Sequence, residues 1–593
     1  MSPAKTLTTA RSIVDDVLTK AMTRDIWTGN YDKVLPVSVQ DFDLGAVLPA
    51  VFYMFRFGHR RGQGKFLDTF GGEGETAKEK KRQATIDRVA AQLAQTEWFN
   101  GIDGPTERAV LGDLLLCFCL ENRNHAIGRT EQIQRVAPAH YMASWIDLPE
   151  SVANLRFVPE MIVAMLADQS KETVEQTEDG QRTWFAVGRG LGENVLLRAF
   201  HQGVQRGEVL ADLKGDRFLE ATEVGLDQLL MIRLAQSLGQ TPEKLRGAGG
   251  ERISNQRPIC ELASHRFSED IRHFVRAYSS VVPRHAFVEL LESCMAVGLT
   301  TIVTSVIELL FEWAETGAVR PKCDQRPAEL FVDASQGVER NLRGLAEQSL
   351  GDFFRRVERF PVILMALRVL DHYARHHPQL KKLKVVTRPY ATEWLGLLGD
   401  LLFERRHEAK QILFDLQVKS ANLTERLDED FPDAAEMLQN EQAQPNVVWR
   451  LAETLTFLQG RKNTQSNLFS LIDSALLMNR PNGLGVRRAV IRKTLPQSAS
   501  KKFDVRSLIF TDSVLDYLVH VHVVHGNKTG YRPRSFRDFL RILRDRYGFC
   551  LDVAPPGTTV SSDLLHANRA VLEQRLRDLG LLVGVNDAEG MKR

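Results

Sequence analysis

Histidine is a common metal ligand, and the segment HVHVVHG contains three: His520, His522 and His525. Ligands on one helical face need a spacing of three or four residues, which His522 and His525 have and His520 does not. The six cysteines form no CxxC pair and lie far from these histidines in the sequence. The pattern therefore favours a partly buried helix end carrying histidines, and we expect neither a bound metal nor another cofactor.

A glycine-rich stretch, GRGLGENVLLRAF at residues 188–200, precedes an expected helix. It lacks the Lys-Ser/Thr pair with which a P-loop holds phosphate and magnesium, and its glycines miss the spacing of a dinucleotide site. No nucleophile elbow and no HExxH motif occur. We therefore assign no catalytic residue. An enzyme with dispersed residues, such as a nuclease, remains an alternative because catalytic groups can lie far apart in sequence.

Arginine is concentrated in RPRSFRDFLRILRDRYGF, residues 532–549, which holds six of them. Ser535 and Gly548 have the residue types of a helix start and stop. Phenylalanine, leucine and tyrosine recur between them at three- and four-residue steps and predict one buried face. Arg537, Arg541 and Arg544 fall on a second face. The stretch thus predicts an amphipathic helix with a row of arginines suited to DNA phosphates.

The segments around this helix give the order of a winged helix-turn-helix. An apolar-periodic helix precedes it, another follows at residues 561–580, and LLVGVNDAEGMKR reads as strand, turn and strand. In that module the third helix often enters the major groove. The residues predicted to contact DNA on the third helix and at the wing are Asn568, Arg569, Arg575 and Lys592. A structural cap docked on the rest of the protein, or a protein–protein module, would have the same element order.

A second basic cluster ends the segment FDLGAVLPAVFYMFRFGHRRGQGKF. Arg56, Arg60, Arg61 and Lys65 stand among glycines, and exposed basic loops of this kind suit phosphate backbones. An ordinary solvated loop explains the same composition.

The elements that must position these residues are almost all helical, because apolar residues recur at three- and four-residue steps through most of the chain. Clear strands are scarce; residues 381–387 and 581–585 are the better candidates. We predict a mainly α, multidomain helical protein with a C-terminal winged-helix-like domain. Polar or glycine-rich breaks give helical domains at 1–167, 183–245 and 258–480, and the C-terminal domain at 500–593.

The break at residues 480–502 contains prolines, glycines and a Ser-Ala-Ser tract, and it looks like a hinge. Residues 1 to about 490 should therefore fold without the C-terminal domain. Charge is uneven on either side of the break. Residues 421–445 carry seven acids and one base, whereas residues 480–506 carry eight bases and one acid. The two segments could neutralise each other inside the fold.

Whole-chain composition sets bounds on the partners. The 593 residues are 43% hydrophobic and 26% charged, with a net charge of +2, so any basic surface must be local. The N-terminal stretch lacks the apolar core of a signal peptide. The longest uncharged stretch, residues 293–307, is shorter than a membrane span and predicts a buried helix. We expect a soluble cytoplasmic protein with reduced thiols and no membrane contact.

The layout of the basic segment at residues 41–65, the long helical middle and the winged-helix-like end resembles large accessory proteins of bacterial antiphage defence operons, of the methylation-associated or BREX type. The resemblance implies a cytosolic protein that acts on DNA with methyltransferase, ATPase or nuclease partners. We therefore expect a non-catalytic component of a DNA-directed assembly, with a helical partner-binding body and double-stranded DNA as ligand. The alternative is a scaffold or adaptor without nucleic-acid contact.

Overall fold

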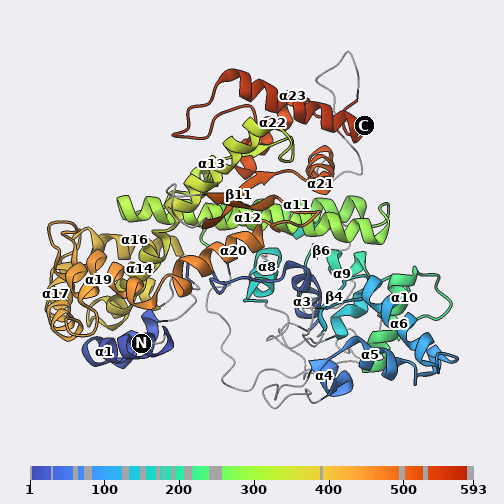
Figure 1. Ribbon diagram of the computed structural model, residues 1–593, viewed down its shortest axis with the longest axis horizontal. Helices are drawn as coiled ribbons and strands as arrows, with labels where there is room; N and C mark the ends of the chain where they lie inside the picture. The colour runs from blue at the N-terminus through green and yellow to red at the C-terminus, as the bar shows by residue number, and fades with distance from the viewer. Residues whose placement is uncertain are drawn as a thin grey trace.

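The computed structural model describes residues 3–27, 31, 33–57, 65–72, 83–122, 133–146, 155–167, 174–177, 180–187, 194–205, 217–239, 257–387, 391–492, 501–524 and 532–583. The protein is mainly helical and divided into several lobes, as the sequence predicts (Figure 1).

A single long helix, α12 (Arg284–Thr316), passes through the middle of the molecule. Every side chain from Ser293 to Ile307 is buried, which confirms the expected buried helix. The helix is long and apolar enough to cross a membrane, but 89% of its most apolar window is buried inside the protein. Its apolar surface is therefore already covered by protein, as in the core helix of a large fold.

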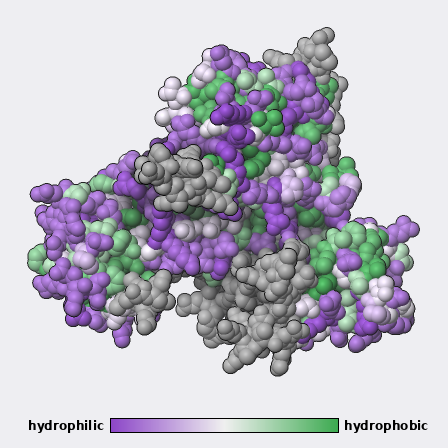
Figure 2. All heavy atoms as spheres, viewed as in Figure 1, coloured by the Kyte–Doolittle hydropathy of each residue, from purple (hydrophilic) through white to green (hydrophobic). Residues whose placement is uncertain are grey.

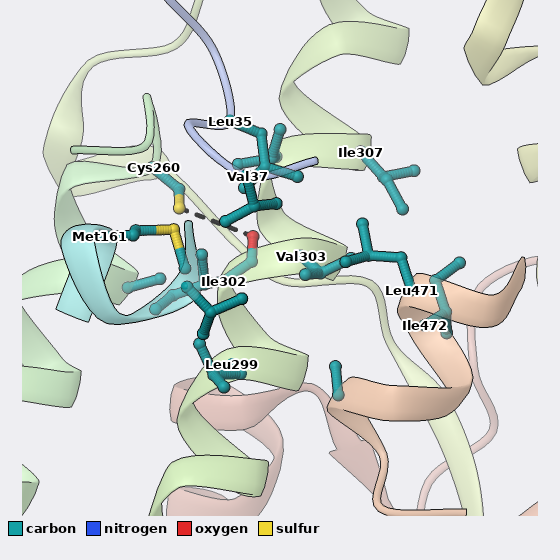
Figure 3. Packing of buried hydrophobic residues seen from close by; sticks show 14 of the residues in the cluster. Leu35, Val37, Met161, Cys260, Leu299, Ile302, Val303, Ile307, Leu471 and Ile472 are labelled. Atoms are coloured by element: carbon teal, nitrogen blue, oxygen red, sulfur yellow. Dashed lines mark hydrogen bonds between the residues drawn. The ribbon is translucent and has the colours of Figure 1, made fainter. Parts of the chain in front are cut away.

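Distant parts of the chain cover α12. Figure 3 shows Leu299, Ile302 and Val303 of this helix packed among residues from the N-terminal segment, α8 and α20. The thiol of Cys260 approaches the carbonyl oxygen of Ile302 at 3.6 Å. One continuous core thus joins the lobes around α12.

The N-terminal part of the chain forms mostly short helices and two-stranded sheets, which extend from the centre to the lower right of Figure 1. A separate small core lies under α5 and α6. The helices of this part are α3 (Leu44–Phe57), α4 (Lys65–Phe70), α5 (Ile86–Leu93), α6 (Pro105–Phe118), α8 (Val158–Leu166), α9 (Val195–Ala199), α10 (Leu226–Leu238) and α11 (Glu261–Tyr278). The strands pair as β1 (Gly71–Gly72) with β2 (Gln83–Ala84), β3 (Leu120–Asn122) with β4 (Ile133–Val136), β5 (Val174–Thr177) with β6 (Gly180–Thr183), and β7 (Val204–Gln205) with β8 (Arg217–Phe218).

The helical lobe, at the left of Figure 1, joins the chain's first helices to a later block. Residues 381–387, predicted as a strand, instead form the 3-10 turn η6 (Leu380–Lys382) and the short helix α15 (Lys384–Thr387), so that prediction is wrong. Four residues, KVVT, are too few for periodicity to separate helix from strand. The helices are α1 (Pro3–Leu18), α2 (Lys20–Ile26), α14 (Phe360–His376), α16 (Ala391–Leu402), α17 (His407–Leu427), α18 (Pro432–Gln439), α19 (Val447–Gln459) and α20 (Asn467–Ala475).

A four-stranded mixed sheet lies above α12 in Figure 1, in the order β10-β11-β9-β12. The strands are β9 (Leu330–Asp333), β10 (Gly485–Arg492), β11 (Lys501–Ile509) and β12 (Phe549–Cys550). β11 and β12 both run parallel to β9, and β10 is the antiparallel edge. The four residues of β9 are all buried, as expected of a strand covered on both faces.

Helices cover both faces of this sheet, and we call the whole unit the sandwich. On one face Phe331 packs with α13 (Arg340–Val357) and α23 (Ser562–Asp578). On the other, Leu330 and Val332 join the main core with α21 (Asp512–Val523) and α22 (Phe536–Tyr547). The sandwich is built from two separate pieces of sequence, because the helical lobe is inserted between α13 and β10.

This arrangement does not confirm a winged helix. Instead of following three helices with an antiparallel wing, the chain places β12 between α22 and α23 and pairs it with β9. The expected wing lies mostly in residues 584–593, outside the described residues. The boundary proposed between 258–480 and 500–593 passes through one sheet, and the supposed hinge contains the whole of β10.

Candidate nucleic-acid interface

The arginine-rich helix α22 has the limits that its sequence predicts. The Ser535 hydroxyl accepts a hydrogen bond from the Asp538 backbone N–H at 3.0 Å, which caps the first turn. Gly548 ends the helix in the left-handed region, with φ of 79°. The predicted apolar face is buried throughout: Phe536, Phe539, Leu540, Leu543 and Tyr547.

A second face of α22, beside the buried one, carries the three arginines predicted to contact phosphates. Arg541 is 66% exposed and pairs with Asp538 at 2.5 Å; Arg544 is 39% exposed and pairs with Asp545 at 3.1 Å. Arg537 is exposed and has no ion-pair partner among the described residues. Exposed pairs within one helix contribute only about 0.3–0.5 kcal/mol. A phosphate could therefore replace these partners at little cost.

Another arginine of the same helix faces inward. Arg546 pairs with Asp270 of α11 at 2.5 Å and with Glu269 at 3.2 Å, while its neighbour Tyr547 donates to Asp270 at 2.8 Å. His522 of α21 lies 3.0 Å from the Tyr547 hydroxyl. Burial, followed by the nearby Arg546 charge, lowers the pKa of His522 well below its usual value. These groups fasten α22 to α11 and α21 and are not available to a ligand.

Two residues predicted to read DNA bases from the third helix lie on its inner side. Asn568 is fully buried; its amide nitrogen donates to Val332 O and Leu551 O, and its oxygen accepts from the Ala334 N–H. Arg575 donates to Ala334 O at 2.8 Å and to Asp512 at 2.5 Å. Both side chains join α23 to the ends of the parallel strands, so neither is presented to DNA in this structure.

Arg569 of α23 packs against the first residue of the arginine-rich helix. Its guanidinium lies 5.6 Å from the ring centroid of Phe536, the first residue of α22. Arg569 is half-buried.

A basic two-stranded ribbon, formed by β10 and β11, occupies the segment expected to be a hinge. Only Leu508 and Ile509 of β11 pair with β9, so the outer parts of the two strands pair only with each other within the described residues. Residues 485–509 carry seven Lys or Arg against one acid, Asp504. The register places Arg492 opposite Lys501 and Ile491 opposite Lys502 at the outer end. The ribbon therefore concentrates positive charge at the edge of the sandwich.

The inner part of the ribbon is anchored by ion pairs. Arg488 binds Glu347 of α13 through two contacts of 2.5 and 2.9 Å, and Arg506 binds Asp473 of α20 through contacts of 2.7 and 2.8 Å. The acidic segment 421–445 pairs elsewhere, with Arg450 to Glu441 at 3.0 Å and Arg426 to Asp16 at 3.2 Å. Among the described ion pairs, none joins the two oppositely charged segments, so the possible neutralisation of one by the other is not seen there.

The basic cluster near the N-terminus is divided. Arg56 is fully buried in α3, with its guanidinium 5.3 and 5.1 Å from the ring centroids of Tyr141 and Trp145. Lys65 donates to Leu238 O at 3.1 Å. Arg60 and Arg61, like Lys592, lie outside the described residues. Arg56 is thus a core residue and not part of an exposed loop.

The ribbon was not predicted, because the Pro, Gly and Ser residues of its segment indicated a hinge between two domains. The signal for it was present: GVRRAVIRK and KKFDVRSLIF are rich in β-branched and aromatic residues. As to metals, no group of three potential ligands lies together in the described part of the chain, and His525 falls outside it.

Comparison with protein-family models matches residues 30–591 to the family of Methylation-associated defense system protein MAD7. Searches of curated proteins and of solved structures found no match. The family match spans nearly the whole chain, and the chain therefore belongs to this family of defence-system proteins.

Proposed function

We propose that this member of a methylation-associated defence system is a DNA-contacting, non-catalytic subunit that binds duplex phosphates through the basic ribbon of β10 and β11. The observation that carries the proposal is the excess of positive charge on β10 and β11, which extend well beyond the two residues of β11 that pair with β9. The arginine row of α22 and Arg569 supply a secondary basic surface. Membership in a multi-protein defence system suggests that other subunits act beside it, and we place the assembly in the cytoplasm.

The chemistry of the ribbon favours phosphate contact over base reading. Lysine and arginine supply charge-assisted hydrogen bonds to any phosphate oxygen, and such contacts position a protein without carrying sequence information. Two-stranded ribbons are an established way for proteins to enter a DNA groove. A purely structural explanation is that charge on the edge strand β10 blocks pairing with other chains. That explanation predicts no affinity for DNA.

A second candidate function is that of a protein adaptor. Phe414 of α17 is 70% exposed and Val418, one turn later, is 45% exposed. Two exposed apolar side chains one turn apart on a helix could form part of an apolar contact surface for another protein. The two functions are compatible, because α17 belongs to the helical lobe and the ribbon to the sandwich.

The test is duplex binding by three forms of the protein: wild type, a ribbon variant with Arg492→Gln, Lys501→Gln and Lys502→Gln, and a control with Lys381→Gln, Lys382→Gln and Lys384→Gln. The control removes the same charge from exposed positions on the helical lobe. We expect micromolar binding by the wild type and the control, and binding at least about tenfold weaker by the ribbon variant.

Equal losses in the ribbon variant and the control would mean that only net charge matters. No duplex binding by the wild type at low salt would favour the adaptor. Divalent-dependent cleavage of the duplex would instead support the enzyme alternative.

A further inference from the structure

A pocket of about 240 Å³ lies in the helical lobe, where the end of α2 meets α14, α19 and α20. One part of its wall is apolar and the other carries amides. The lining residues are Leu7, Trp27, Val39, Gln40, Phe360, Pro361, Leu364, Met365, Arg368, Gln459, Asn463, Thr464, Asn467 and Leu468.

A π-helical turn, η7 (Lys462–Ser466), forms part of the polar wall. Its widened hydrogen bond runs from the Ser466 N–H to Arg461 O at 3.0 Å. Asn463 donates from its side chain to Gln459 O at 3.0 Å, and Thr464 donates to Gly460 O at 3.0 Å. π-turns are rare and occur often at functional sites, because they displace side chains from the ordinary helical positions.

Arg368 of α14 is the cation of this pocket. Arg368 is only 7% exposed. Its one described hydrogen bond, which it donates to Ile26 O, is long, at 3.5 Å. Its Nε is buried without a hydrogen-bond partner in the described structure. Burial lowers the pKa of Arg368 to about 10, so the side chain still carries its charge at neutral pH.

The carboxylate next along the helix does not neutralise Arg368. Asp371 is bound by Lys33 at 2.6 Å and by Arg375 at 3.0 Å. Among the described residues that line the pocket, Arg368 is the one cation and none is an acid. A buried charge without a carboxylate partner costs free energy unless something supplies the missing charge.

We propose that this pocket binds a small organic anion with a single carboxylate, whose charged end pairs with Arg368 and whose apolar body rests on Met365, Leu468 and Trp27. The lone cation suits one negative charge better than the two of a phosphate. The planar guanidinium matches a carboxylate in shape. The volume exceeds the roughly 150 Å³ of a cavity that holds benzene and is below that of a drug-sized site.

The experiment uses the full-length protein and three carboxylate probes: 4-fluorobenzoate observed by fluorine NMR, and hexanoate and acetate as competitors. The neutral probe is 4-fluorobenzamide, the uncharged amide of the same acid. We expect 4-fluorobenzoate to bind, hexanoate to displace it more strongly than acetate, and the neutral amide not to bind. Inorganic phosphate should compete less well than hexanoate.

The variant is Arg368→Met, and the matched control is Arg461→Met, which removes an exposed arginine paired with Glu358 beside the π-turn. Binding of 4-fluorobenzoate should weaken by about tenfold or more in Arg368→Met and remain unchanged in the control. Arg368→Lys, which keeps the charge and loses the planar fork, should bind with intermediate strength. No carboxylate binding up to about 10 mM, or equal binding by Arg368→Met, would overturn the proposal.

Thermal unfolding separates this role from a structural one. Replacing a buried charge that lacks a carboxylate by an apolar side chain of similar length is often neutral or stabilising. The thermal midpoint of Arg368→Met without ligand should therefore equal or exceed that of the wild type. A much lower midpoint would make Arg368 a structural residue and contradict the proposal.

Discussion

Asn568 holds three backbone segments together through one side-chain amide. Its partners, Val332, Ala334 and Leu551, belong to β9, the loop after β9 and the residue after β12. Two of these partners lie more than two hundred residues away in sequence. A sequence shows that asparagine and arginine occur on a helix but not which face a distant strand will cover. For that reason Asn568 and Arg575 were predicted to contact DNA and instead close the end of the sheet.

Replacing Asn568 by Ala should destabilise the sandwich. The change leaves two carbonyls and one N–H buried without their partner, at an expected cost of about 2–4 kcal/mol in the free energy of unfolding. The urea midpoint of unfolding would show the loss. Asn422→Ala, at an exposed position of α17, is the control. Unchanged stability together with weaker DNA binding would instead indicate that the Asn568 side chain contacts DNA.

His522 should make stability depend on pH. Burial holds its folded-state pKa well below that of the unfolded chain, so the folded protein keeps the imidazole neutral. The stabilisation is complete above the unfolded pKa of about 6.5 and declines as pH falls below it. His522→Gln keeps an N–H donor for Tyr547 and should flatten the fall in thermal midpoint between pH 7 and pH 5. His566→Gln, on the exposed side of α23, should leave the fall as steep as in the wild type.

Among the elements, α22 was predictable almost completely and β9 was not. The limits of α22 follow from Ser535 and Gly548, and its buried face follows from apolar spacing, because these signals are local. β9 has four residues, LFVD, all buried, so it shows no alternation of polar and apolar side chains. Without β9 the sheet could not be foreseen, and β10 and β11 looked like a break between domains.

The arginine row of α22 should contribute less to DNA binding than the ribbon. Replacing Arg537, Arg541 and Arg544 together by Gln removes three cations from a helix whose exposed side also carries the acids Asp538 and Asp545, so its local excess of positive charge is smaller than that of the ribbon. We expect a small, equal loss of affinity for every duplex sequence, with thermal stability changed by no more than about 0.5 kcal/mol per exposed site. Fluorescence anisotropy with two unrelated duplexes measures the effect. A sequence-dependent loss would show that these arginines read bases.

At the scale of the whole molecule, the sandwich and the core around α12 make the lobes interdependent. The sandwich takes β9 and α13 from one part of the chain and β10 to α23 from another, and α21 packs directly against α12. The sequence correctly predicted the helical class and the buried central helix. It could not show that a helical lobe is inserted into an α/β unit, because an insertion leaves no local signal.

The pairing of β9 with β11 and β12 argues against our expectation that residues 1 to about 490 fold alone. Without β11 and β12, both edges of β9 lose their partners and the core face of α12 beneath α21 is exposed. We expect the truncated chain to aggregate. By contrast, a protein cut by protease between residues 480 and 502 should elute from gel filtration as one complex. Separation of the two fragments without denaturant would show that the units are independent.

The central claim is that the ribbon binds DNA phosphates. Its most direct test is the slope of the logarithm of the duplex association constant against the logarithm of salt concentration, compared between wild type and the Arg492→Gln, Lys501→Gln, Lys502→Gln variant. Each phosphate contact contributes about 0.9 to that slope, so the loss of three should flatten it by about 2.7. The lysine control on the helical lobe should keep the wild-type slope. Identical slopes for wild type and ribbon variant, with both proteins folded, would contradict the account.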